Sequence, residues 1–369
     1  MPRLTQAKAP LTCEVDAVNE FGQHISVSVP AERALTVYVD KRELVTLMTL
    51  GAHPELLVLG YLCNQRLIKD VTDIESITVD WDVGAAAVKT RSGIADIEEK
   101  TSRRVVTTGC GQGSVFGGLM DDIEQIQLPV HSAMSQTQLY ALVNTIRLKE
   151  TTYKSSGSVH ACALFCLAAG EPDMLLFVED VGRHNAIDTI AGWMAMNMAS
   201  TLVASRTALP PEEALRLRTG EAGPAAPACK DMTPMLVDSD PEGLALHTTG
   251  RPTSELVASR TALPPEEALR LQTGEAGPAA PACKDMAHML VDSDPEGLVF
   301  YTTGRLTSEM VIKSAQMGVP IVVSRSGITQ MGYQVAQSVG LCAIGRATNK
   351  RFLCYTHAQR LLLEPGLAG

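Results

Sequence analysis

The chain has 369 residues, a formal net charge of −10 and a hydrophobic fraction of 45%. This composition is typical of a soluble globular protein, and the acidic charge argues against broad binding to nucleic acid. No apolar run reaches the roughly 18 residues that a membrane span needs, and residues 1–6 lack the apolar stretch of a signal peptide, so a cytoplasmic protein is expected.

The first third of the chain predicts a small α+β domain at residues 31–134, preceded by an N-terminal arm at residues 1–30. A hairpin is expected early in this domain, because two β-prone runs flank a polar turn at Asp40-Lys41-Arg42. The expected elements, in chain order, are strands at residues 35–39 and 44–47, a helix at 54–64, and strands at 76–81 and 85–90.

The pattern then changes to alternating strands and helices, which predicts a second domain at residues 135–369. Continuous apolar strands between helices favour an α/β sheet that is covered on both faces. The expected strands are residues 159–168, 174–178, 299–303, 320–324 and 341–345, and the expected helices are residues 135–148, 188–198, 308–318 and 329–339.

A tandem duplication interrupts this domain, in an insert at about residues 200–297. Residues 202–255 recur as residues 256–309, and only seven positions differ between the copies. Two copies are too few for a solenoid. The second copy is predicted to supply the strand of the sheet, because it carries Val299-Phe300-Tyr301 where the first has Ala245-Leu246-His247.

One thiol stands in a glycine-rich loop, Gly109-Cys110-Gly111-Gln112-Gly113, after a strand-like run. Glycines permit positive φ angles, and successive N–H groups in such a loop can stabilise a thiolate. The loop is therefore either a nucleophile site or a tight turn that contains a cysteine. The chain has nine cysteines and no Cys-x-x-Cys pair, so reduced thiols are expected, with no resident metal.

The run from Glu179 to Asp188 is dense in ionisable side chains at a strand-to-helix transition. Ligands of open α/β sheets bind at such carboxyl ends, and a helix N-terminus favours an anion. Arg183 and His184 are therefore candidate site residues, and the alternative is a polar loop with a capping Asp. His160, in an apolar run, is expected either in the core or in the site.

These stretches resemble the formate dehydrogenase accessory sulfurtransferase family, FdhD/NarQ, and the Glu179 to Asp188 run is the most specific match. The other matching stretches are Gly109-Cys110-Gly111, Val159 to Ala163, Thr303 to Val311, Val322 to Ser326 and Tyr355 to His357. Together they cover most of the chain outside the duplicated insert.

The resemblance implies a three-layer α/β domain of the cytidine-deaminase type after a smaller N-terminal domain, and a homodimer. It implies a sulfur carrier that accepts persulfide sulfur from a cysteine desulfurase on Cys110. The resemblance further implies that the sulfur passes to a molybdenum bis(molybdopterin guanine dinucleotide) cofactor, a bound substrate, before the cofactor enters formate dehydrogenase. The cofactor-binding stretch falls on Arg346-Ala347-Thr348-Asn349-Lys350-Arg351; without the resemblance, this stretch is typical of a solvated basic turn.

Two departures from the family pattern affect the interpretation. Gly113 stands where many members carry a second cysteine, which excludes a mechanism through an internal disulfide at that loop. Gln65-Arg66 replaces the family's usual Glu-Gly after its first helix, and we interpret it as a surface change. The alternative function is a chaperone that binds the cofactor without covalent sulfur chemistry. A zinc nucleoside deaminase is excluded, because no His-x-Glu precedes a Pro-Cys-x-x-Cys.

Overall fold

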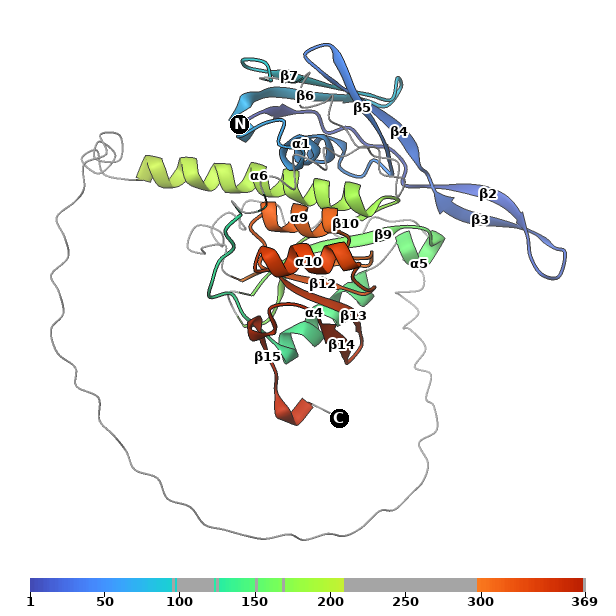
Figure 1. The fold of residues 1–369 in the computed structure, drawn as a ribbon. Helices are drawn as coiled ribbons and strands as arrows, with labels where there is room; N and C mark the ends of the chain where they lie inside the picture. Colours follow the sequence, from blue (N-terminus) through green and yellow to red (C-terminus); the bar gives the residue numbers. More distant parts are fainter. Residues whose placement is uncertain are drawn as a thin grey trace, which may run out of the picture. The chain divides into compact units, whose positions relative to one another are not determined.

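The computed structural model describes residues 1–94, 97, 123, 126–149, 152–167, 170–208 and 297–367. Within these ranges the chain forms a five-stranded and a six-stranded sheet with two smaller two-stranded ones, and helices pack against the larger sheets (Figure 1). None of the helices in the described ranges combines the length and the apolar character that crossing a bilayer requires.

The N-terminal sheet has five strands in the order β1-β6-β7-β4-β5. Their bounds are β1 Arg3–Leu4, β4 Arg33–Val39, β5 Arg42–Thr49, β6 Ile74–Asp80 and β7 Ala85–Thr90. The predicted hairpin is confirmed, since β4 and β5 pair antiparallel around Asp40 and Lys41, whose φ angles are 46° and 74°. Such left-handed pairs suit a two-residue hairpin turn. A separate hairpin pairs β2 (Thr12–Val18) with β3 (His24–Pro30).

Helix α1 (Pro54–Asn64) has the predicted bounds and packs against helix α6 (Arg183–Ala208). Two glycines allow the backbones to touch. A Cβ on Gly60 would lie 1.6 Å from the carbonyl oxygen of Asp188, and a Cβ on Gly192 would lie 2.0 Å from that of Leu56. No other residue fits at these two positions without separating the helices. The α1–α6 contact therefore fixes α6 against the helix that covers the N-terminal sheet.

The C-terminal sheet has six strands in the order β10-β9-β11-β12-β13-β14. Their bounds are β9 His160–Cys166, β10 Asp173–Asp180, β11 Leu298–Thr302, β12 Ile321–Ser324, β13 Cys342–Thr348 and β14 Arg351–Cys354. Strands β11, β12 and β13 run parallel. Strand β9 is antiparallel to both of its neighbours, and β14 is antiparallel to β13.

Helices cover both faces of this sheet, as expected. Side chains of a strand alternate between faces: in β11, Val299 and Tyr301 join the core under α4 (Gln136–Lys149). Leu298 and Phe300 join the opposite core, under α6 and two further helices. The remaining elements are α5 Thr152–Ser156, α9 Ser308–Gln316, α10 Gln330–Ser338, β8 Met134–Ser135, β15 Leu361–Leu362, and the short 3₁₀ turns Val71–Asp73, Ala358–Arg360 and Pro365–Leu367. The fold is a mixed α/β one.

The second repeat copy supplies β11, which confirms the prediction from its strand-forming residues. Val299, Phe300 and Tyr301 are at most 1% exposed, so the side chains that differ between the copies fill the core. Helix α6 runs on to Ala208, beyond the predicted helix end at residue 198. The first copy after Ala208 lies outside the described residues.

Candidate functional site

The C-terminal sheet brings several chain segments to one edge. Asp180 at the end of β10 pairs with His160 at the start of β9, and Thr302 at the end of β11 pairs with Ser324 at the end of β12. At the next strand, the Arg346 N–H donates to the Ser326 carbonyl over 2.6 Å. The parallel strands thus end together where α/β sheets bind ligands. His160, the start of α6 and the basic segment at residues 346–351 share this edge.

Two acidic residues of the Glu179 to Asp188 run hold elements together. The Glu179 carboxylate accepts the N–H groups of Thr152 and Tyr153, at 2.9 and 3.1 Å, at the start of α5. The Asp180 carboxylate accepts the Thr49 hydroxyl and the Leu50 N–H, at the end of β5 in the N-terminal sheet. The hydrogen bonds of these two residues connect elements of the fold, so the alternative of a polar loop with a capping acidic residue holds for this part of the run.

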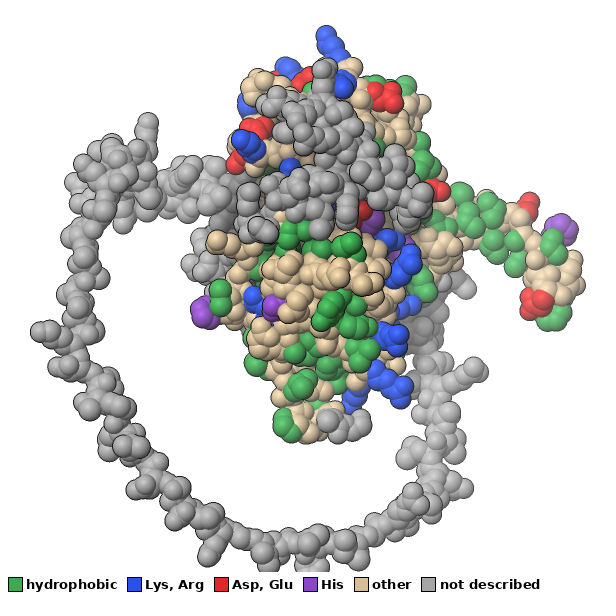
Figure 2. Space-filling view, viewed as in Figure 1, with side chains coloured by type: hydrophobic (Ala, Val, Ile, Leu, Met, Phe, Trp, Pro, Cys, Tyr) green, Lys and Arg blue, Asp and Glu red, His purple; other side chains and the backbone are tan. Residues whose placement is uncertain are grey.

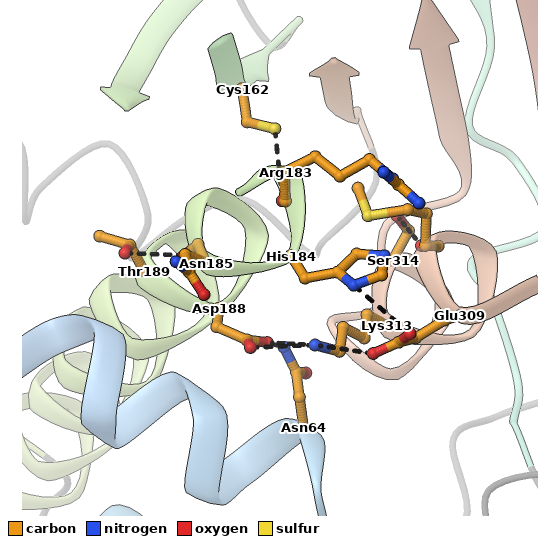
Figure 3. A network of polar contacts seen from close by, with 11 residues as sticks. Asn64, Cys162, Arg183, His184, Asn185, Asp188, Thr189, Glu309, Lys313 and Ser314 are labelled. Carbon is orange, nitrogen blue, oxygen red and sulfur yellow. Dashed lines mark hydrogen bonds and ion pairs between the residues drawn. The ribbon is translucent and has the colours of Figure 1, made fainter. Parts of the chain in front are cut away.

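A buried charge cluster links α6 to α9 and α1 (Figure 3). The Lys313 ammonium is fully buried and lies 2.9 Å from both Asp188 carboxylate oxygens and 3.3 Å from Glu309. Asn64, at the end of α1, donates to the other side of Asp188 over 2.7 Å. Burial alone would lower the Lys313 pKa, but the two carboxylates outweigh it and raise that pKa, so the ammonium stays charged.

His184 sits on this cluster and turns one ring nitrogen toward it. Its Nδ1 lies 3.4 Å from the Glu309 carboxylate (Figure 3). Burial, together with the charges of Lys313 and Arg183, lowers the His184 pKa to about 3 although Glu309 opposes the shift. The neutral ring therefore carries its proton at Nδ1, facing Glu309. Nε2 is buried and has no hydrogen-bond partner among the described residues, so it is available to accept a donor from a ligand.

Arg183, the first residue of α6, lies against Gly304, two residues after the end of β11. A Cβ on Gly304 would lie 2.6 Å from the Arg183 Cδ, so the glycine makes room for the arginine side chain. His160 is half-buried, and burial, Arg183 and Arg305 all lower its pKa. The structure thus brings His160, Arg183 and His184 together, with Arg305 as a fourth member.

The predicted cofactor-binding segment lies at the end of β13, the following turn and the start of β14. A groove of about 660 Å³ is lined by Arg346, Thr348, Lys350 and Arg351 from this segment. Its other lining residues are Gln136, Tyr140, Phe352, Leu353 and Leu367. Ala347 is 1% exposed and lies in the core under α4, and Asn349 forms the turn with a φ of 51°. The groove therefore combines cations with aromatic walls.

A β-bulge aims one of the groove cations. The pairing of β13 with β14 shifts register between Gly345 and Thr348, and Arg346 within the bulge has a left-handed φ of 51°. Bulges re-aim side chains and are frequent beside functional sites. Across the groove, the Tyr140 hydroxyl donates to the Lys350 carbonyl over 3.1 Å. The turn is thereby held against α4.

Cations continue along the whole edge of the sheet. Figure 2 shows Lys and Arg side chains gathered down one side of the face in view. The cations at this edge come from the strands and from the loops and helix that follow them, and they are Arg183, Arg305, Arg325, Arg346, Lys350 and Arg351. Arg325 also stacks over the Tyr153 ring at 5.3 Å, which fixes its guanidinium at the edge. In a chain with a net charge of −10, this edge is a local exception.

The predicted nucleophile loop, Gly109, Cys110, Gly111, Gln112 and Gly113, lies outside the described residues. Among the described cysteines, Cys162 is fully buried and donates to the Thr302 hydroxyl at 3.3 Å. Burial raises its pKa to about 12, and burial likewise raises that of Cys63 to about 12. Both thiols are therefore unreactive at neutral pH.

Sequence reasoning missed several residues that build this site. Glu309 and Lys313, spaced i,i+4 on α9, are the partners of His184 and Asp188, and this spacing was the available signal. Arg305 and Arg325 lie in stretches that match the family, but neither they nor Tyr140 was assigned a site role, because only the strand pairing shows that they share an edge with His160 or the groove.

Comparison with known proteins places the chain in a family. The sequence model of the FdhD/NarQ family matches residues 30–208 and 287–362. The chain belongs to the FdhD/NarQ family. The unmatched stretch between these ranges falls within the two repeat copies.

Curated relatives and a solved structure agree with this assignment. The sulfur carrier protein FdhD of Bacillus subtilis (strain 168) is 22% identical over 331 residues, which are 89% of this chain and 88% of that protein. The sulfur carrier protein FdhD of Geobacillus kaustophilus (strain HTA426) is 21% identical over 336 residues, 91% of this chain and 90% of that protein. A crystal structure described as a formate dehydrogenase accessory protein from Desulfotalea psychrophila has a similar fold, with a TM-score of 0.55, 16% identity, and coverage of 96% of this chain and 100% of that one.

Proposed function

We propose that this protein is a sulfur carrier for a formate dehydrogenase. In this proposal Cys110 accepts sulfur from the persulfide of a cysteine desulfurase and delivers it to the molybdenum bis(molybdopterin guanine dinucleotide) cofactor. Family membership and the names of the curated relatives support the sulfur-carrier role. The observation that carries the cofactor part is the cationic edge of the C-terminal sheet.

The proposed substrate is a polyanion, and the edge offers what such a substrate needs. Guanidinium groups pair with phosphate oxygens through two parallel hydrogen bonds. Arg346, Lys350 and Arg351 line the groove, and the Tyr140 and Phe352 rings beside them offer flat surfaces against which a base can stack. A diphosphate in the groove would therefore meet cations and aromatic groups from one hairpin and one helix.

The remaining site residues suit orientation of the same substrate. Arg183 places a further cation at the start of α6, where the first N–H groups of a helix favour an anion. The Nε2 of His184, which has no hydrogen-bond partner in the described part of the chain, can accept a hydrogen bond. Glu309 lies beside the other ring nitrogen, and Lys313 pairs with Glu309. A neutral imidazole also avoids a further fixed charge beside Arg183.

The sulfur transfer itself requires one nucleophilic thiolate. The Cys110 thiolate attacks the outer sulfur of the desulfurase persulfide, and the desulfurase cysteine leaves as its thiolate, so one sulfur atom moves without net oxidation. The substrate then takes that outer sulfur, and the Cys110 thiolate leaves. Because the sulfur passes from the persulfide level to the sulfide level, the step needs two electrons, which in this proposal the reduced molybdenum substrate supplies. Because Gly113 replaces the second cysteine of many relatives, one thiol must perform both steps.

A non-covalent chaperone for the cofactor is the second candidate. The groove favours it, because its described lining needs no thiol to bind an anionic nucleotide. Mass spectrometry of the intact protein after incubation with a cysteine desulfurase and cysteine separates the two functions. A gain of about 32 Da that disappears in Cys110→Ala supports the carrier. No gain in a protein that still binds guanosine diphosphate supports the chaperone.

A further inference from the structure

Two thiols outside the proposed sulfur-transfer site lie in contact on the last two strands of the C-terminal sheet. The sulfur atoms of Cys342 in β13 and Cys354 in β14 are 3.8 Å apart. Cys354 pairs across the strands with Ile344, so Cys342 is its diagonal neighbour on the same face of the sheet. Both thiols belong to the core on the α4 side. Two cysteines on adjacent strands are thus already oriented toward each other.

The two thiols differ in access and in charge preference, as a reactive pair requires. Cys342 is fully buried, whereas Cys354 is half-buried on the edge strand and can be reached by a small oxidant. The hydrogen bond from Cys342 lowers the Cys354 pKa, while the same contact raises that of Cys342. Cys354 is the better nucleophile, and Cys342 stands behind it as a resolving thiol.

We propose that Cys342 and Cys354 form a redox-sensitive site that closes into an intrachain disulfide when a small hydroperoxide reaches it. The Cys354 thiolate attacks the terminal oxygen of the hydroperoxide, and the other oxygen leaves as an alkoxide, or as hydroxide when the oxidant is hydrogen peroxide, which gives a sulfenic acid. The Cys342 thiol, which lies in contact with Cys354, attacks the sulfenic sulfur. Its proton passes to the leaving hydroxyl group, so water leaves and no free Cys342 thiolate is needed. Two thiols and one hydroperoxide thereby become one disulfide, one water and one alcohol, or two waters when the oxidant is hydrogen peroxide.

The position of this pair connects it to the groove. Cys342 and Cys354 bracket the segment at residues 346–351, so a bond between them closes a loop that contains every cation of the groove. A disulfide at the base of the hairpin formed by β13 and β14 restrains the two strands against each other. It thereby also restrains the turn that carries Lys350. Thiol reductants reverse it. The site would make the binding hairpin respond to oxidant stress.

Trypsin makes the test direct, because it cleaves after Arg346, Lys350 and Arg351 and leaves the two cysteines on separate peptides, 326–346 and 352–360. The full-length protein is exposed to hydrogen peroxide, alkylated in denaturant and digested without reduction. The expected result is a linked peptide whose mass is two hydrogens below the summed masses of the two unmodified peptides. The yields of the two separately alkylated peptides should fall about tenfold and recover when the protein is treated with dithiothreitol before alkylation.

Two variants make the result specific. Cys354→Ser must abolish the linked peptide, whereas Cys13→Ser, which removes an exposed cysteine of β2, must leave it unchanged. The proposal is overturned if peroxide oxidises Cys13 in the wild-type protein while Cys342 and Cys354 are still recovered as separately alkylated peptides. Neither outcome depends on sulfur transfer, so a failure here leaves the proposed function standing, and a failure of sulfur transfer leaves this site standing.

Discussion

The buried ammonium of Lys313 lies 2.9 Å from both carboxylate oxygens of Asp188, although 125 residues separate them in the chain. Asp188 precedes the tandem repeat on α6 and Lys313 follows it on α9. Glu309, the last residue of the second copy, completes the cluster and holds His184. The pair therefore joins the two sides of the duplication and supports the candidate site.

We expect Lys313→Met to destabilise the protein by about 3–5 kcal/mol. The substitution leaves the Asp188 and Glu309 carboxylates buried without their cation, which costs far more than the pair gains. Urea unfolding measures the change. Lys89→Met is the matched control, because Lys89 pairs with Glu75 at an exposed position and is expected to change stability by less than about 1 kcal/mol. Equal effects of the two substitutions would contradict a structural role for the buried cluster.

His184 should make stability depend on pH between about 3 and 6.5. Its pKa is about 3 in the folded protein and near 6.5 in the unfolded chain, so the unfolded state binds the proton first as the pH falls. The folded state is therefore favoured above pH 6.5 and loses stability below it, by about 1 kcal/mol between pH 7 and pH 5.5. His184→Gln should remove this part of the slope.

The control for this pH effect is an exposed histidine away from the buried cluster. His24 lies at the exposed start of β3, so His24→Gln makes the same substitution and leaves the cluster intact. Unfolding curves at pH 5.5 and 7 for the three proteins provide the comparison. An unchanged slope in His184→Gln would mean that folding does not shift the His184 pKa, which would contradict its burial as a neutral ring.

Deletion of the first repeat copy, residues 202–255, should leave the fold intact. The second copy then follows Thr201 directly, and its first seven residues are identical to those that end α6. Strand β11, Leu306 and Glu309 all come from the second copy and remain in place. A shorter connection changes the closure entropy by only about 0.6 kcal/mol, so the melting temperature should stay within a few degrees.

Deletion of the second copy, residues 256–309, is the matched contrast. The resulting chain has the same length as the chain that lacks the first copy. In it, however, Ala245-Leu246-His247 replace the buried residues of β11, and Pro252 replaces Leu306. Leu306 is fully buried, and its N–H donates to the Gly327 carbonyl, a bond that proline cannot make. A loss of more than about 5 kcal/mol is expected. Similar melting temperatures for both deletions would show that the copies are interchangeable.

Arg351→Ala should weaken the binding of guanosine diphosphate about tenfold, since it removes one charge-assisted contact from the groove. Arg147→Ala, at the exposed last turn of α4, should leave binding unchanged. Titration calorimetry at two salt concentrations measures both, and the affinity of the wild-type protein should fall with added salt. Equal affinities of the two variants would place the nucleotide outside this groove.

Periodicity predicted the elements well where local sequence decides them. Helix α1 has the predicted bounds, and α4 begins at Gln136, one residue after the predicted start at Ser135, whose hydroxyl accepts the Gln138 N–H. The choice of the second copy for β11 also followed from local strand preference. The interpretation of Gln65-Arg66 as a surface change was wrong for Gln65, which is 5% exposed, because its burial depends on tertiary packing.

The site could be predicted only in part, for a physical reason. Glu179 and Asp180 belong to a run that the sequence predicts as a candidate site, yet their carboxylates accept hydrogen bonds from α5 and from the N-terminal sheet. No pattern along the chain shows that Glu309 faces His184, since helix packing alone brings α9 beside α6. Sequence thus identified residue types that build the edge, and strand pairing decided which of them share it.

The most direct measurement follows labelled sulfur through Cys110. The protein is loaded from a desulfurase with ³⁵S-labelled cysteine, freed of the desulfurase and incubated with molybdenum bis(molybdopterin guanine dinucleotide). We predict that label leaves the protein and appears on the cofactor, that Cys110→Ala takes up no label, and that Cys13→Ser behaves as the wild type. Label that reaches the cofactor equally well with folded Cys110→Ala, or that never leaves the wild-type protein, would contradict the account.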